Sequence, residues 1–88
     1  MTHYYMVHYR ISDPAKFWAG VNGQLATVPK DVKIHFSAPN QNGSELTSLW
    51  EGADPGVLQQ FLKTTTMGGA ANFEAMKVDI GKAFGLPI

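Results

Sequence analysis

Aromatic and β-branched residues dominate the segment from residue 3 to residue 11, which is too short for a helix of ordinary length. We therefore expect a strand, in which alternate side chains point to opposite faces. The odd-numbered face carries His3, Tyr5, Val7, Tyr9 and Ile11, and the even-numbered face carries Tyr4, Met6, His8 and Arg10. Because both faces hold apolar groups, the pattern predicts a strand that is covered on both sides.

Two later segments show the spacing of amphipathic helices. Asp13-Pro14 and Asp54-Pro55 each place an acidic cap before a proline, whose missing N–H is harmless at the first helical position. The apolar stripes that follow are Phe17, Val21 and Leu25 with Trp18 beside them, and Val57, Leu58, Phe61 and Leu62. The second helix is predicted to end near Lys63 or Thr66, before the Met67-Gly68-Gly69 turn.

Alternation of apolar and polar residues over 32–37 predicts a half-buried strand, and Asn42-Gly43 after it predicts a hairpin. A two-residue turn would pair His35 with Trp50 and Phe36 with Leu49. A four-residue loop would shift the register by two and keep the same faces. The predicted faces are Val32, Ile34 and Phe36 with Thr47, Leu49 and Glu51, and His35 and Ser37 with Leu46, Ser48 and Trp50.

The last part of the chain fits two structures. Phe73, Met76, Ile80 and Phe84 have helical spacing, while residues 73–78 also suit a short strand. We favour a strand at 73–79, because a sheet of three strands would leave one edge of the first strand open. Residues 81–87 would then form a short turn or helix.

The resulting order of strand, helix, strand, strand, helix, strand is the split β-α-β pattern of the ferredoxin-like α+β fold, in one domain over 1–88. In this fold, two helices cover one face of a four-stranded antiparallel sheet. The other face would expose Tyr or Met side chains of the first strand and either Trp50 or Leu49. Such a patch is larger than a monomer usually exposes, so we expect a homodimer.

Composition narrows the classes of function. Seven basic and seven acidic residues give a net charge of zero, which argues against nucleic-acid binding through phosphate contacts. There is no cysteine, and although 44% of the residues are hydrophobic, no apolar run approaches the length of a membrane helix. Since no secretory signal is visible at the start of the chain, we expect a soluble, cytoplasmic protein.

Three stretches resemble the dimeric α+β barrel superfamily. They are Ile11-Ser12-Asp13-Pro14 after the aromatic strand, Leu49-Trp50-Glu51-Gly52-Ala53-Asp54, and Ala83-Phe84-Gly85-Leu86-Pro87. The resemblance covers nearly the whole chain and is architectural, with no catalytic signature. It implies two sheets packed face to face across a two-fold axis. The superfamily includes cofactor-independent monooxygenases, polyketide cyclases, muconolactone-isomerase-like proteins, nickel-binding proteins and members without known activity.

The histidines are the first candidates for acid–base chemistry, because only they titrate near neutrality. The resemblance implies that His8 could face a pocket between sheet and helices and take a proton from a substrate, as a strand histidine does in the cyclases. The competing interpretation places His8 at the dimer seam. His35 with Trp50 could form an aromatic wall for a planar ligand or a pair in the interface, Tyr4 could line a pocket, and Arg10 could hold an anionic group.

Metal and nucleotide chemistry have little support. His3 and His8 are five residues apart and point to opposite faces of one strand, so they cannot bind the same ion unless a bulge intervenes, which leaves nickel or zinc at a dimer seam as the form a metal site would take. No nucleotide-binding or serine-hydrolase motif occurs. We expect a homodimer that binds or converts a small apolar or aromatic molecule without a cofactor, with His8 and His35 as catalytic candidates. The alternative is a non-catalytic ligand- or metal-binding module.

Overall fold

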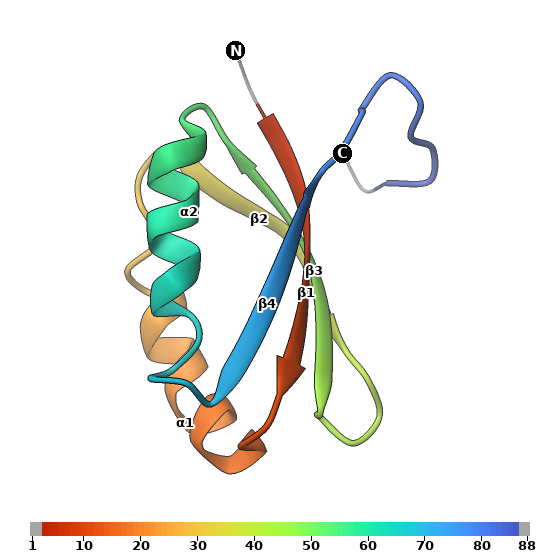
Figure 1. Cartoon of the computed structure of the whole chain (residues 1–88). Helices are drawn as coiled ribbons and strands as arrows, with labels where there is room; N and C mark the ends of the chain where they lie inside the picture. Colours follow the sequence, from red (N-terminus) through yellow and green to blue (C-terminus); the bar gives the residue numbers. More distant parts are fainter. Residues whose placement is uncertain (1–2, 87–88) are drawn as a thin grey trace.

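Four strands and two helices alternate along the chain in the computed structural model, which describes residues 3–86. They are β1 (His3–Ile11), α1 (Pro14–Leu25), β2 (Val32–Pro39), β3 (Glu45–Gly52), α2 (Pro55–Thr64) and β4 (Ala71–Lys77). The strand order in the sheet is β2-β3-β1-β4, and all neighbours are antiparallel. Both helices lie on one face (Figure 1). The predicted ferredoxin-like α+β fold is confirmed.

Both helices begin where the caps predict. The Asp13 carboxylate accepts a hydrogen bond from the backbone N–H of Lys16 at 3.2 Å. The Asp54 carboxylate accepts from the N–H groups of Gly56 and Val57 at 2.8 and 3.4 Å. Each side chain satisfies amides that a helix leaves without an internal partner.

The threonine run ends α2. The hydroxyls of Thr64, Thr65 and Thr66 each donate to the carbonyl three residues earlier, at 2.6, 2.6 and 3.0 Å. These bonds compete with continuation of the helix. Met67 and Gly68 then take left-handed φ values of 53° and 66°, and the chain turns toward β4.

The two helices contribute unequally to the core. In α2, Leu58, Phe61 and Leu62 are buried, whereas Val57, which was expected in the same stripe, is 41% exposed. In α1 only Phe17 is fully buried, and Trp18, Val21 and Leu25 pack against the core while partly exposed. Most of the packing energy of the helical layer therefore comes from α2.

Strand β1 runs through the centre of the sheet, and its two faces differ. Tyr5, Val7, Tyr9 and Ile11 are buried under the helices, with exposed fractions of 0–9%. The even-numbered residues from Tyr4 to His8 are half-buried, and Arg10 is exposed. We call the face that carries these even-numbered residues, on the side of the sheet away from the helices, the open face.

A β-bulge at His35 corrects the predicted register between β2 and β3. Phe36 pairs with Leu49 as expected, but Ile34 rather than His35 pairs with Trp50. A bulge inserts one extra residue on one strand, so side chains beyond it change face. Ile34 consequently lies with Trp50 on the helix side and Phe36 lies with Leu49 on the open face, so the prediction that Ile34 and Phe36 share a face is wrong.

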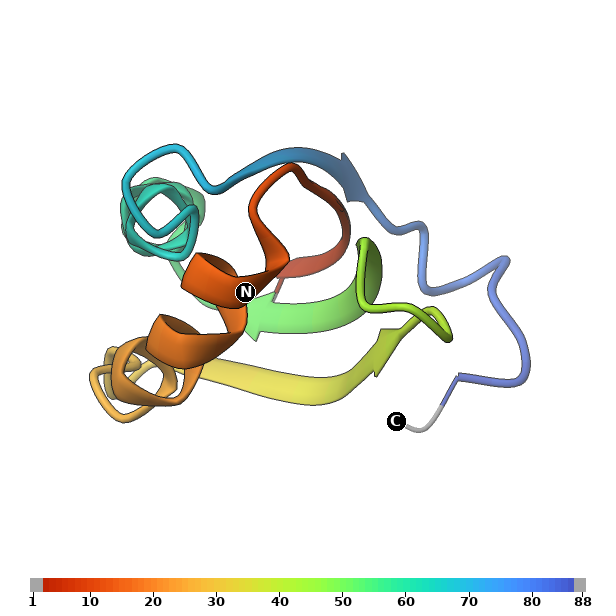
Figure 2. The same ribbon diagram turned by 90° about the horizontal axis from the view of Figure 1, so that it is seen from below.

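The C-terminal part of the chain settles the choice between helix and strand. Residues 71–77 pair with β1 from Ile11 to Tyr5, which confirms a strand. Beyond it, residues 79–86 form a turn and an extended segment on the side of the sheet away from both helices, as Figure 2 also shows. Pro87, included in the predicted closing turn, lies outside the described residues. Within residues 3–86, neither helix is long and apolar enough to cross a membrane.

Candidate functional site

A small cavity lies between α1 and the sheet. Its volume is about 20 Å³, enough for roughly one water molecule. The residues that line it come from α1, from the strands and from the end of α2. They are Tyr9, Phe17, Val21, Leu25, Ile34, Ser37, Leu46, Ser48, Trp50 and Thr65. None of them carries a charge, so this helix-side cavity suits a neutral and largely apolar molecule.

Tyr9 supplies the phenol of the cavity wall. Its hydroxyl lies 2.7 Å from Thr65 Oγ1, and the Thr65 hydroxyl in turn donates to the Leu62 carbonyl at 2.6 Å. Since the Thr65 proton is directed at that carbonyl, the Tyr9 hydroxyl is the donor of the bond between them. Burial raises the pKa of Tyr9 above its ordinary 10.0, although the bond to Thr65 opposes the rise. The phenol is therefore neutral at physiological pH.

Trp50 and Ser48 form the second polar pair. Both are almost fully buried, at 2% and 1% exposure, and the indole Nε1–H donates to Ser48 Oγ at 2.7 Å. The Ser48 hydroxyl points on toward the Val7 carbonyl, with the two oxygens 3.5 Å apart. Because the two residues are two apart on β3, they share the helix-side face of the sheet.

The second half of α1 covers the cavity with few anchors. The first half is held by buried Phe17 and by the Trp18 Nε1–H, which donates to the Gly43 carbonyl at 2.9 Å. Further along, Met67 lies directly over Gly20, where a Cβ atom would come within 2.7 Å of the methionine sulfur. Gly20 and Gly23 also lower the helix propensity of this half. No side chain in the second half of α1 is fully buried, in contrast to Phe17 in the first half.

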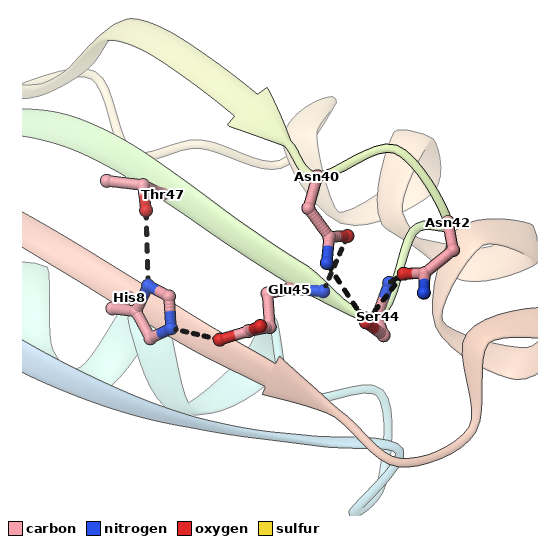
Figure 3. A network of polar contacts seen from close by, with 6 residues as sticks. All are labelled: His8, Asn40, Asn42, Ser44, Glu45 and Thr47. Atoms are coloured by element: carbon pink, nitrogen blue, oxygen red, sulfur yellow. Dashed lines mark hydrogen bonds and ion pairs between the residues drawn. The ribbon is translucent and has the colours of Figure 1, made fainter.

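The open face carries a different polar group, centred on His8. Its Nδ1 lies 3.1 Å from Thr47 Oγ1 and its Nε2 lies 3.0 Å from a Glu45 carboxylate oxygen, as Figure 3 shows. With the carboxylate as acceptor, the neutral imidazole is protonated on Nε2, and Nδ1 accepts from the Thr47 hydroxyl. The Asn40 side chain helps to hold Glu45 by accepting from its backbone N–H at 3.0 Å (Figure 3).

Two hollows flank His8. One of about 230 Å³ lies toward the hairpin and includes Glu45 and Thr47, and one of about 240 Å³ lies toward β4 and includes Arg10 and Glu74. Both are open to solvent in a single chain.

The second histidine of this face is His35. Its Nε2 lies 2.7 Å from a Glu51 carboxylate oxygen, and its ring centroid lies 6.0 Å from that of Tyr4. Trp50 is on the opposite face of the sheet. The bulge therefore separates the predicted pair of His35 and Trp50 and gives His35 a carboxylate instead.

The predicted site residues consequently fall into two groups. Tyr4, His8, Arg10 and His35 lie on the open face, and Trp50 alone lines the helix-side cavity. The idea that His8 faces a pocket between sheet and helices is wrong, because even-numbered residues of β1 point away from the helices. His8 lies instead on the open face, next to Thr47 and Glu45.

A hollow of about 640 Å³ lies between Pro29 and the outer side of α2. It is a wide, open depression. Its one carboxylate, Asp54, already caps the helix, and Val57 is its exposed apolar group. Among residues 3–86, no group of three or more histidine or acidic side chains is arranged to hold a metal ion. We therefore regard the helix-side cavity, and not the hollow beside α2, as the first candidate for a ligand site.

Of the residues that line the cavity, only Trp50 was a predicted site residue, and the polar residues Tyr9, Ser37, Ser48 and Thr65 were not. Tyr9 was visible as a member of the odd-numbered face of the first strand, and Ser48 lies two residues from Trp50 on one strand face. Thr65 belongs to the threonine run near the predicted end of the second helix, and this position alone does not suggest a cavity residue. Bringing it to Tyr9 requires the packing of α2 on β1, which no local pattern reveals.

Comparison with known proteins supports the fold and leaves the family open. No protein-family model and no curated protein matches the chain. Among solved structures, SnoaB, a cofactor-independent oxygenase from Streptomyces nogalater studied as a variant, has 9% identity and a TM-score of 0.65, covering 96% of this chain and 97% of SnoaB. At such identity, the likeness shows the fold alone.

Two further structures share this architecture. An uncharacterized protein from Thermotoga maritima has 11% identity and a TM-score of 0.64, covering 90% of this chain and 100% of that protein. A dimeric ferredoxin-like protein from an uncultured marine organism has 7% identity and a TM-score of 0.51, covering 88% of this chain and 92% of that protein. These neighbours support the ferredoxin-like fold, and one of them is described as dimeric.

Proposed function

We propose that the protein is a homodimer in which each chain binds a small, neutral, apolar or aromatic molecule in the helix-side cavity and converts it without a bound cofactor. The observation that carries the proposal is the cavity itself: an apolar, uncharged space whose wall includes the hydroxyl-bearing residues Tyr9, Ser48 and Thr65. Ligand sites commonly combine an apolar wall with a few placed polar groups.

The cavity must enlarge to admit a ligand, since sites for drug-sized molecules measure roughly 300–1,000 Å³. The second half of α1 is the element that can move, because Val21 and Leu25 are only partly buried and two glycines lie between Phe17 and Leu25. Its displacement would widen the cavity while the sheet stays intact. Binding would then depend on the population of the opened state.

The open face supports the homodimer. Tyr4, Met6 and Phe36 are partly exposed on it, and Met76, which pairs with Met6, is 64% exposed. A second copy stacked on this face would remove apolar surface from water, worth about 25 cal/mol per Å² buried. The dimeric ferredoxin-like neighbour provides a precedent for association in this fold.

Conversion without a cofactor is supported by SnoaB, a cofactor-independent oxygenase of the same fold. In this chain, Tyr9 is the titratable group that lines the cavity. As a neutral phenol, it can orient a ligand by hydrogen bonding. A binding protein without turnover is the alternative, and assay for product separates the two.

A second candidate function places a ligand on the open face, with His8 as the proton-accepting group. The hydrogen-bonded chain from Thr47 through His8 to Glu45, with a hollow on each side, favours it. Arg10 would then hold an anionic group and Tyr4 and His35 would lie at the far end of the same face. This site would open only in the monomer or at a barrel end left uncovered by the dimer.

One binding experiment tests both candidates. The probe is 1-naphthol, a neutral aromatic molecule, followed by NMR chemical shifts of the wild-type chain. We expect the largest shifts at the Trp50 indole and at Val21. Val21→Trp, which fills the cavity, should abolish binding, while Val57→Trp, on the exposed side of α2, should leave it unchanged.

The outcomes separate the candidates. Loss of binding in His8→Ala with retention in Val21→Trp would transfer the site to the open face and overturn the cavity proposal. Mass analysis of 1-naphthol after incubation with the protein in air-saturated buffer reports turnover. An unchanged probe would mean that the protein binds the molecule without converting it. One equivalent of metal per chain by elemental analysis would instead favour a metal-binding module.

A further inference from the structure

The exposed apolar side chains are concentrated near the C-terminal end of the described chain. Large apolar side chains with high exposure in residues 3–86 are Val57, Met76, Ile80 and Phe84, at 41%, 64%, 45% and 94%. Three of these four lie within residues 76–84. Phe84 is the most exposed of the four, and an almost fully exposed phenylalanine is rare in a folded monomer.

This segment leaves the sheet on the side of the open face. Its last sheet hydrogen bond runs from the Val78 N–H to the Tyr4 carbonyl at 2.8 Å. Beyond that point, Figures 1 and 2 both show residues 79–86 on the side away from the helices. We call residues 79–86 the C-terminal arm.

The arm is shaped by its own hydrogen bonds. The Asp79 carbonyl accepts from the N–H groups of Lys82 and Ala83, both at 3.1 Å, and the Asp79 carboxylate accepts from Gly81 N–H at 3.1 Å. Gly85 has a φ of 77°, which turns the chain again after Phe84. The arm thus presents Ile80 and Phe84 in a defined turn although almost nothing covers Phe84.

The apolar surface of the arm continues that of the open face. Met76 pairs with Met6 and shares its face, so the exposed series Met76, Ile80 and Phe84 starts on the open face and extends past the sheet. A second copy stacked on this face would lie within reach of the arm. Two-fold symmetry would give each copy one donating arm and one receiving surface.

From this placement, we propose that the C-terminal arm docks on the second copy and places Phe84 against the partner's apolar surface at the edge of the dimer. The inference rests on the proposed homodimer and names the segment that completes its interface. Burial of one phenylalanine from each chain would tighten the dimer by well over tenfold.

The first measurement is the dimer dissociation constant by sedimentation equilibrium. Phe84→Ser in the full chain should raise this constant at least about tenfold, and Val57→Ser should leave it unchanged, because Val57 lies on the helical side. Circular dichroism serves as the folding control, and both variants should keep the wild-type spectrum since both side chains are exposed.

The second measurement locates the arm. The chain has no cysteine, so Lys82→Cys, at a side chain that is 87% exposed, accepts a single nitroxide label. Labelled chains are mixed with isotope-labelled chains that lack the nitroxide, so that line broadening reports only contacts between copies. We expect broadening of the Met6, Leu49 and Met76 methyl signals and none at Leu58, a buried residue of α2 on the other side of the sheet.

Each outcome has one meaning. The docking of the arm is wrong if Phe84→Ser does not weaken the wild-type dimer, or if no broadening occurs between copies. Either result is compatible with a homodimer. Broadening confined to the labelled chain itself, seen when one chain carries both labels, would mean that the arm folds onto its own open face. A wild-type chain that stays monomeric at millimolar concentration overturns the homodimer and the arm together.

Discussion

The two faces of the sheet use the same kinds of residue for different purposes. On the helix side, Tyr9, Ser48 and Trp50 are buried, and each polar atom has a partner within the chain. On the open face, Tyr4, Thr47 and His35 remain partly exposed. The helix side is complete in one chain, whereas the open face has polar pairs and apolar patches that a second chain would cover.

This difference indicates that the helix side stabilises the folded chain and that the open face is the one available for association with a second chain. Buried groups contribute through lost water contact and through bonds that are costly to leave unmade. Half-exposed groups contribute little to the folding of one chain, and ion pairs such as His8 with Glu45, at 42% and 50% exposure, are worth little in water. We therefore expect matched substitutions on the two faces to have unequal effects.

The largest difference should separate two phenylalanines. Phe17→Ala removes a fully buried ring and should lower the free energy of unfolding by about 3–5 kcal/mol. Phe36→Ala, on the open face, should cost less in folding and weaken the dimer. Urea denaturation at several protein concentrations measures both terms. Equal losses that do not depend on concentration would contradict the division between faces.

The next difference concerns neighbouring residues on β3. Ser48→Ala leaves the buried Trp50 N–H without its acceptor, which should cost about 1–3 kcal/mol. Thr47→Ala removes only a bond to the partly exposed His8 and should cost less than about 1 kcal/mol. Thermal unfolding compares the two variants. A larger loss in Thr47→Ala would show that the open face carries folding energy within one chain.

The smallest difference appears at neutral pH between two tyrosines. Tyr9→Phe removes the bond to Thr65 and should cost about 1 kcal/mol, and Tyr4→Phe should cost less. The pH dependence is more informative. Because burial raises the pKa of Tyr9, the unfolded chain loses this proton from about pH 10 while the folded chain keeps it.

The sign of the effect follows directly. The contribution of Tyr9 is fully present below pH 10.0 and is lost as the pH rises through the higher folded value, so the free energy of unfolding should fall in that range. Tyr9→Phe should show a smaller alkaline fall than wild type. Identical alkaline profiles for Tyr9→Phe and wild type would mean that Tyr9 ionises freely in the folded chain.

Much of the fold could be predicted from local patterns. The caps Asp13 and Asp54 act on adjacent amides, and the alternation in β1 reflects a strand whose two faces meet different surroundings. The choice of a strand for 71–77 needed a topological argument, since Phe73 and Met76 also suit a helix. These features depend on neighbours in sequence or on the rules for sheet edges.

The candidate site could be predicted only in part. The pairing of His35 with Trp50 failed because a bulge adds one residue on β2, and the alternating pattern of 32–37 does not reveal it. His8 and Arg10 were predicted site residues, but they lie outside the cavity because the helices cover the other face of the sheet. Local spacing places residues on a face without saying what covers it.

The amino-acid sequence by itself determined the order of elements, the helix starts and the excess of apolar surface, because short-range sterics, capping bonds and side-chain periodicity act within a few residues. Only the tertiary structure decided which face of β1 the helices cover, and it brought Tyr9 to Thr65 across 56 positions of the chain. Those contacts depend on the strand register and on helix packing. Both arise from the simultaneous burial of distant apolar groups.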